Sequence, residues 1–456
     1  MSDAENLVRQ ARAKGVELVR FYFCDSSGIL RGKVSSLKTL PERLVSGIGV
    51  VKGSMAQNLL DQLQTDTGLG AVGEVRLMPD TNSFTALPYT QASAAMFCRM
   101  EELSGQAWSH CSRSFLERQV EEARKMGFSV KAAFEPEFIV GEQKDGEFRH
   151  IDKGLCFSSE SMDMADGFIT EVVRLLTLQG LDLEQYYPEL GPGQHELSIA
   201  PASPLSACDR YLLLKETVKA CAASRGLHAT FTPKRSVEEA GNGCHLHLSL
   251  YDESGRVNQF FHSEAGKDSA SGQSGLSKTA MHFIAGVHSH LKALVSLTCP
   301  SVNSYKRLRP HSWSSAFTAW GYENREAAIR VPSVYRGRES DSTNIEIKCV
   351  DSTANPYLAL GAILACGLDG IKRLALPPAP VEVDPADLDD AGQKFHGVEP
   401  LPRSLNEALT ELEADLFLMN TLGKELANTY IIVKTSEAAA FEDDPAFSDS
   451  VHRARY

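Results

Sequence analysis

Apolar residues recur along the chain with two periods, and their alternation predicts a sheet covered by helices. Before residue 105 the pattern predicts a β-hairpin, with strands over 16–23 and 29–34 and a turn over 25–28, then further short strands. Beyond it the pattern predicts strands over 129–140, 194–200, 243–250 and 344–350, and helices over 109–127, 161–179, 206–225, 277–297 and 356–372. We therefore expect two domains, 1–105 and 106–456, the second a sheet faced by helices.

Two segments interrupt this pattern. The Ser/Gly-rich stretch 262–276 is expected to be a mobile loop, and 376–402, with its prolines and acidic centre, an irregular excursion. No internal repeat of fixed period is present in the sequence.

Composition narrows the class of protein. The 456 residues are 43% hydrophobic, enough for a core, and no apolar run has the length of a signal peptide or a membrane span. None of the ten cysteines forms a C-x-x-C pair, which favours a reduced, cytoplasmic protein. A net charge of −13 argues against a nucleic-acid partner.

The predicted strand 129–140 carries two carboxylates, Glu135 and Glu137, within an apolar stretch. Alternate side chains of a strand share a face, so both carboxylates point the same way. Two buried like charges need a counter-charge, and a hard divalent cation is the usual one. An edge strand with two solvated acids is the alternative for this motif taken alone.

Other predicted strands repeat the arrangement. A tight Gly/Pro turn joins Glu189 to Glu196, and Glu346 shares a strand face with Lys348. The polar face of strand 243–250 and a basic set further along the chain complete the group: His245, His247, Ser249, Lys306, Arg307, Arg309, Arg325 and Arg330. Together they offer ligands for divalent cations and guanidinium groups for phosphate and carboxylate.

Six motifs occur in order: EPEF, ELGPGQHE, GNGCHLHLS, NSYKRL, NRxAAIRVP and DSTANPYLA. The set resembles the signature of the glutamine synthetase family, from the N-terminal hairpin to about residue 434. The resemblance implies an α+β protein, with a β-grasp N-terminal domain and a catalytic domain whose curved antiparallel sheet is faced by helices. It also implies a homo-oligomeric ring, commonly a dodecamer of two stacked hexamers, in which a neighbour's N-terminal domain completes each active site. ATP would phosphorylate the γ-carboxylate of glutamate, and an amine would then displace phosphate.

The resemblance assigns roles to positions of this chain. One Mg²⁺ or Mn²⁺ would be held by Glu137, Glu189 and Glu196, and another by Glu135, His245 and Glu346. Arg325 and Lys348 would be the catalytic cations. The implied ATP-binding residues are Glu184, His247, Ser249, Arg325 and Arg330, and the implied substrate-binding residues are Gly241, Arg307, Lys348, Trp313 and Lys52.

The chain departs from the family where ammonium binds. Glutamine synthetases use an Asp in an F-D-G-S-S latch and a Glu after N-S-Y-K-R-L, and by resemblance these positions are Lys52 and Trp313 here. Neither side chain attracts ammonium or accepts its proton. On the glutamate side Ala240 replaces an Asn and Lys348 an Arg, and Asn344 replaces an Arg near the phosphates.

We therefore expect an ATP-dependent ligase that joins the γ-carboxylate of glutamate to a primary amine other than ammonia, in amine catabolism or detoxification. Trp313 favours a neutral or apolar amine. The alternatives are a γ-glutamylpolyamine synthetase, a true glutamine synthetase with a rearranged amine site, and an inactive member with a structural or regulatory role. An inactive member would have no reason to retain six metal ligands.

Overall fold

The computed structural model describes residues 3–144, 147–236, 238–262, 275–442 and 444–456. The N-terminal part is a sheet of strand order β2-β1-β6-β4-β3, with β5 paired to β6. β1 and β6 are parallel, and the other pairs are antiparallel. Its elements are α1 (Asp3–Ala13), β1 (Leu18–Cys24), β2 (Leu30–Ser36), α2 (Leu40–Ser46), β3 (Ile48–Val51), β4 (Glu74–Pro79), β5 (Thr85–Ala86) and β6 (Ser93–Glu101).

The larger part is a second sheet of order β13-β14-β15-β12-β7-β10-β9, with β8 and β11 also paired to β7. All its pairs are antiparallel except β13 with β14. Its strands are β7 (Phe128–Lys144), β8 (Glu147–His150), β9 (Leu183–Pro188), β10 (Gln194–Ile199), β11 (His228–Thr230), β12 (Cys244–Asp252), β13 (Trp320–Tyr322), β14 (Ile329–Val331) and β15 (Ile345–Ile347).

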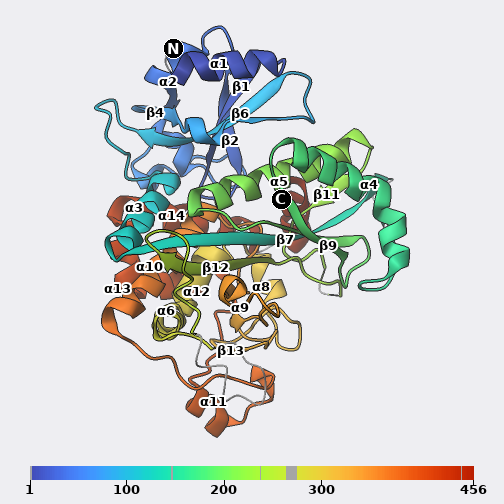
Figure 1. Cartoon of the computed structure of the whole chain (residues 1–456), viewed down its shortest axis with the longest axis vertical. Coiled ribbons are helices and arrows are strands. Elements are labelled where there is room, and N and C mark those ends of the chain that lie inside the picture. Colours follow the sequence, from blue (N-terminus) through green and yellow to red (C-terminus); the bar gives the residue numbers. More distant parts are fainter. Residues whose placement is uncertain (1–2, 145–146, 237, 263–274, 443) are drawn as a thin grey trace.

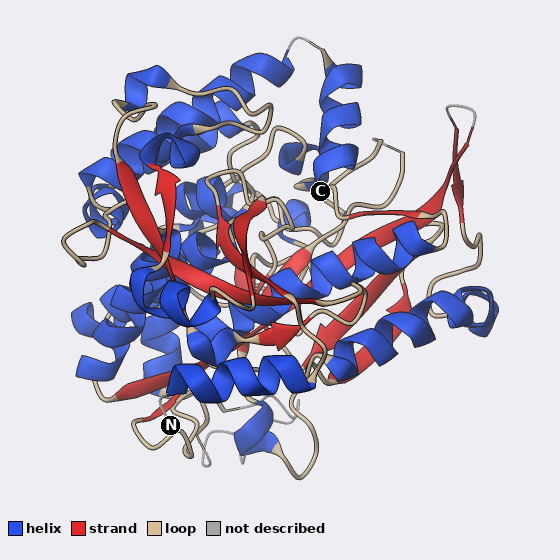
Figure 2. Ribbon diagram, turned by 90° about the horizontal axis from the view of Figure 1, so that it is seen from above, coloured by secondary structure: helices blue, strands red, loops and turns tan. Residues whose placement is uncertain are grey.

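Helices surround this sheet, and Figure 2 shows several of them running alongside its strands. The helices are α3 (Ser112–Lys125), α4 (Ser159–Leu178), α5 (Pro204–Ser224), α6 (Lys278–Ser289), α7 (Leu291–Thr298), α8 (Ser304–Arg307), α9 (Glu339–Ser342), α10 (Pro356–Arg373), α11 (Asp390–His396), α12 (Leu405–Ala414), α13 (Leu416–Leu422), α14 (Lys424–Glu442) and α15 (Pro445–Arg455). The expected α+β class, with a sheet faced by helices, is confirmed.

The predicted strands of the large sheet and most predicted helices are present, and two expectations need correction. The single helix expected over 277–297 is divided into α6 and α7, because His290 leaves the helical conformation (φ −114°) and pairs with Asp415. The excursion 376–402 is not wholly irregular, since it contains α11. Most of the expected mobile loop 262–276 lies outside the described residues.

The two parts meet where the β1–β2 turn contacts the start of α10. A Cβ on Gly28 would lie 2.3 Å from the carbonyl oxygen of Thr353, so only glycine allows this approach. Asn355 caps α10 and also donates to the carbonyl oxygens of Cys24 and Asp25. Figure 1 shows the N-terminal sheet stacked on the helices α3, α5 and α14. The junction therefore joins segments more than 300 residues apart.

The large sheet and its helices are held together by burial of apolar side chains between them. Ala132, Phe134 and Phe138 of β7 join a core with α5 and α10, while the alternate positions of β7 carry the polar residues. All ten cysteines are free. Within the described residues, no helix has both the length and the apolar character needed to span a membrane.

Candidate active site

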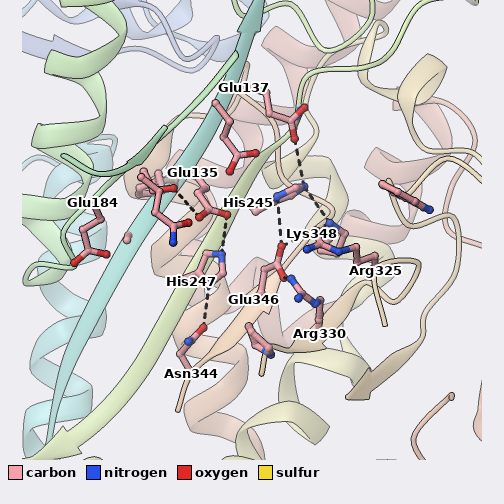
Figure 3. Close-up of a pocket in the computed structure, with 18 of the residues that line it drawn as sticks. Glu135, Glu137, Glu184, His245, His247, Arg325, Arg330, Asn344, Glu346 and Lys348 are labelled. Atoms are coloured by element: carbon pink, nitrogen blue, oxygen red, sulfur yellow. Dashed lines mark hydrogen bonds and ion pairs between the residues drawn. The ribbon is translucent and has the colours of Figure 1, made fainter. Parts of the chain in front are cut away.

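Strand register brings the predicted site residues to one face of the large sheet. Glu137 of β7 lies directly opposite Glu196 of β10, and Glu135 lies opposite His245 of β12. Glu346 of β15 is one strand further across, opposite His247. Directly opposed residues in a sheet project to the same side. All six predicted metal ligands line one cavity of about 1250 Å³. Figure 3 labels four of them, Glu135, Glu137, His245 and Glu346.

One group of possible ligands is Glu135, His245 and Glu346, whose ligand atoms all lie within 4.8 Å of one another. Nδ1 of His245 is 3.3 Å from Oε1 of Glu346. Burial, and then the nearby Lys348 ammonium, hold the pKa of His245 well below its usual value, so its imidazole is neutral. A neutral imidazole is the form that binds a metal. This group is the second set predicted from the sequence.

The other group is Glu137, Glu196 and His245. Burial, followed by repulsion from Glu189, raises the pKa of Glu137 to about 7. Burial and repulsion from Glu135 and Glu137 likewise raise the pKa of Glu196. The carboxylates are therefore costly to ionise together, and a divalent cation would relieve that cost.

Glu189 differs from the expectation. It lines the cavity, but among the described residues it is not part of the group that contains Glu137 and Glu196. Its Oε2 accepts from the backbone N–H of Leu190, within the turn before β10. Its role as a metal ligand stays a prediction.

The donor set fits Mg²⁺ or Mn²⁺, since it combines clustered carboxylate oxygens with one neutral imidazole. When bound, such ions would neutralise phosphate oxygens and stabilise charge during phosphoryl transfer. Glu135, His245 and Glu346 would hold one ion, and Glu137 and Glu196 another.

Cationic side chains lie beside this acidic centre. Nη1 of Arg330 is 2.7 Å from Oε2 of Glu346, and Nζ of Lys348 is 3.6 Å from the other oxygen of the same carboxylate. His247 is held between Glu135 (3.1 Å) and Asn344 (2.9 Å), and the Glu135 charge raises its pKa to about 9 despite burial. The wall thus presents positive charge next to the carboxylates (Figure 3).

The remaining predicted nucleotide residues line the same cavity. Ser249 is buried on β12, while Glu184 and Arg325 are exposed at its surface. Figure 3 shows Glu184 apart from Arg325 and Arg330, with the carboxylates between them.

Arg307 is the buried guanidinium of the cavity. Its Nη2 donates to the carbonyl oxygen of Val350 at 2.9 Å, but its buried Nε has no hydrogen-bond partner within the described residues. A Cβ on Gly241 would lie 2.6 Å from Cγ of Arg307, so Gly241 lets the loop approach this side chain. Arg307 and Gly241 together form a wall of the cavity where the guanidinium could bind a carboxylate.

The two residues expected at the amine lie apart in the single chain. Trp313 lines the cavity with 54% of its surface exposed. Lys52, at the start of the short 3₁₀ helix Lys52–Ala56, lies outside the cavity lining and pairs with Glu102 at 2.8 Å. Of these two residues, Trp313 lines the cavity of its own chain and Lys52 does not.

Sequence reasoning missed three hydrogen-bonding residues on the β9–β10 side. Oγ of Ser198 donates to Glu135 at 2.8 Å, the Tyr187 hydroxyl donates to Glu196, and Nε2 of Gln194 donates to Glu137 at 3.1 Å. Gln194 and Ser198 lie two residues before and after Glu196 on β10 and so share its face, which strand periodicity could have shown. Tyr187 is opposite Glu196 on β9, which only the strand pairing reveals.

The chain is similar in sequence to known proteins over almost its whole length. Residues 109–450 match the family model "Glutamine synthetase, catalytic domain", and residues 3–108 match "Glutamine synthetase N-terminal domain". The chain is 33% identical over 447 residues to the gamma-glutamylpolyamine synthetase GlnA3 of Streptomyces coelicolor, covering 96% of this chain and 93% of that protein. It is 32% identical over 424 residues to the glutamine synthetase of Pyrococcus abyssi, covering 92% and 90%.

Solved structures of related proteins have the same fold as this chain. A crystal structure of a novel glutamine synthase homolog superposes with a TM-score of 0.83 at 32% identity, covering 97% of this chain and 99% of that one. A GmaS/ADP complex superposes with a TM-score of 0.83 at 29% identity, covering 97% of each chain. The chain therefore belongs to the glutamine synthetase family of ATP-dependent ligases.

Proposed function

We propose that the enzyme joins the γ-carboxylate of L-glutamate to a primary amine other than ammonia. The observation that carries this proposal is Trp313, an indole on the cavity wall where the family resemblance places a glutamate. A carboxylate there would attract ammonium and accept its proton, and an indole does neither. The similarity to a γ-glutamylpolyamine synthetase supports an organic acceptor.

The proposed reaction has two steps. An oxygen of the glutamate γ-carboxylate attacks the γ-phosphorus of ATP, and ADP leaves. The amine nitrogen then attacks the acyl carbon and forms the C–N bond. The C–O bond to phosphate breaks, phosphate leaves with its electron pair, and the nitrogen loses a proton to water or phosphate. Arg307, with its unpartnered Nε, would bind the α-carboxylate of glutamate, and Arg325 and Lys348 would stabilise the charge that moves between oxygens.

A panel of acceptors tests the proposal. Phosphate release would be measured with ATP, Mg²⁺ and glutamate in the presence of ammonia, small alkylamines, arylamines or diamines. We expect an apolar or weakly basic amine to give the highest kcat/KM and ammonia to give little turnover. Ammonia exceeding every organic amine would identify a true glutamine synthetase, and no turnover with any acceptor would indicate an inactive member.

A polyamine acceptor is the second candidate, and two carboxylates favour it. Glu238 and Glu239 line the cavity, where they could pair with the distal ammonium group of a diamine. In the same panel, a diamine exceeding its monoamine of equal length at neutral pH would support this candidate. Equal turnover of the two would contradict it.

We also propose a homo-oligomeric ring in which Lys52 reaches a neighbouring subunit's site. Support comes from its position outside its own chain's cavity lining, and from the family, whose members commonly oligomerise. Mass photometry should show a dodecamer, or a hexamer if rings do not stack. A monomer alone would contradict the proposal.

A further inference from the structure

Trp313 lies in a loop, residues 310–315, with an unusual backbone. His311, Trp313 and Ser315 have φ values of 55°, 52° and 68°, and none is glycine. A non-glycine residue in this left-handed region costs about 1 kcal/mol or more. Three of them within five residues will persist only if other contacts hold the loop.

Those contacts come from two carboxylates and a serine. The backbone N–H of Trp313 donates to Oε1 of Glu326 at 2.7 Å, and Nδ1 of His311 is 2.9 Å from Oδ2 of Asp384. Oγ of Ser314 donates to the carbonyl oxygen of Arg307 at 2.6 Å. The loop is thus held at His311 and at Trp313, and Ser314 joins it to Arg307, the residue proposed to bind glutamate.

The two carboxylates share one support, the segment 381–384. Glu326 is 8% exposed, and its backbone N–H donates to Oδ1 of Asn324. Nδ2 of Asn324 donates to the carbonyl oxygens of Val381 and Val383, both at 2.9 Å. Val381 is fully buried in a small apolar cluster. The segment that reads as irregular in the sequence therefore supports the loop through Asn324 and carries Asp384 itself.

We infer that Glu326 and Asp384 are positioning residues that hold the Trp313 indole against the acceptor side of the cavity, and so determine which amine is used. The inference rests on the proposed function. Neither carboxylate is among the residues that line the cavity, whereas Trp313 is. Both therefore act through the loop and not by touching the amine.

Kinetics separate positioning from a merely structural role. Glu326→Ala removes the acceptor for the Trp313 N–H, and we expect the KM for the preferred amine to rise about tenfold, with the KM values for glutamate and ATP within about twofold. Glu326→Gln keeps an oxygen acceptor and should restore the amine KM. Glu323→Ala is the matched control, an exposed residue nearby that also has positive φ.

Fluorescence tests the loop without turnover. Trp108 and Trp320 are buried, with 4% and 1% exposure, so acrylamide quenching reports mainly Trp313. Quenching should increase in Glu326→Ala, and in Asp384→Ser, which retains a cap for Ala386 but loses the contact to His311. Quenching and amine KM that match the unmodified enzyme in both variants would overturn the inference. If no organic amine is used but quenching increases, the proposed function fails and the positioning of Trp313 stands.

Discussion

At the scale of single residues, charge decides the proposed chemistry of the amine site. The indole of Trp313 offers an apolar face, and Lys52 would bring a positive charge from a neighbouring subunit. A unit charge at about 4 Å contributes on the order of 1 to 4 kcal/mol, so reversing it changes the preferred acceptor.

Replacing these residues should therefore restore the use of ammonia. We expect Trp313→Glu to raise kcat/KM for ammonia, and Lys52→Asp combined with it to raise it further. Because both would face one small site, their effects should couple by more than about 0.5 kcal/mol in a double-mutant cycle. Strict additivity would place Lys52 away from the amine.

Gln194 connects the acidic centre to the substrate loop. Its Nε2 donates to Glu137, to the Gly241 carbonyl oxygen and to Asn242, and its Oε1 accepts from the N–H of Gly191. Gln194→Ala should weaken Mn²⁺ binding about 10- to 100-fold, because the Glu137 carboxylate loses its side-chain donor and keeps only the backbone N–H of Gly243 on that oxygen. Electron paramagnetic resonance of free Mn²⁺ measures this.

The matched control is Gln143→Ala, an exposed glutamine further along β7. Its Mn²⁺ affinity should equal that of the unmodified protein. Unchanged affinity in a folded Gln194→Ala protein would show that Glu137 is oriented without this amide.

At the scale of elements, α10 depends on one side chain at its start. Oδ1 of Asn355 accepts from the N–H groups of Tyr357 and Leu358, and its Nδ2 donates to the β1–β2 turn. Asn355→Ala should lower the free energy of unfolding by about 2–4 kcal/mol, because it removes a helix cap together with two buried hydrogen bonds to the carbonyl oxygens of Cys24 and Asp25. Urea denaturation gives the value.

Ser404→Ala provides the comparison, since Ser404 caps α12 and, within the described residues, makes no hydrogen bond to the N-terminal domain. It should cost only about 1 kcal/mol. Equal losses in the two variants would mean that the contacts of Asn355 with the turn contribute nothing.

At the scale of the whole molecule, a buried carboxylate joins the two domains. Glu437 of α14 accepts from the Ser27 hydroxyl and from the N–H of Leu59 at 2.8 Å, and pairs with Lys434 at 2.8 Å. Glu437→Ala should lower the thermal midpoint, because it leaves the fully buried Lys434 ammonium unpaired, at a cost of about 3–5 kcal/mol. Differential scanning fluorimetry measures the midpoint.

Removing both the Glu437 carboxylate and the Lys434 ammonium tests whether the unpaired ammonium causes the loss of stability. In Glu437→Ala with Lys434→Met no buried charge remains unpaired, so the midpoint should recover part of the loss. A double variant less stable than Glu437→Ala would contradict this explanation.

The sequence by itself identified six possible metal ligands, all of which line the cavity, and it showed which of them share a strand face. Strand alternation requires Glu135 and Glu137 to share a face, and His245 and His247 likewise, whatever the strands pair with. The ordered motifs identified the family, because each preserves a local spacing that needs no knowledge of distant contacts.

Tertiary structure decided which residues meet. The register of β7 with β10 places Glu137 opposite Glu196, and the β9–β10 pairing adds Tyr187. His290, where α6 ends and α7 begins, pairs with Asp415, and the Trp313 loop is supported through Asn324 by the segment 381–384. These partners are from nine to more than a hundred residues apart in the sequence. Local periodicity cannot reveal them, because their proximity is fixed only when the sheet and its helices pack together.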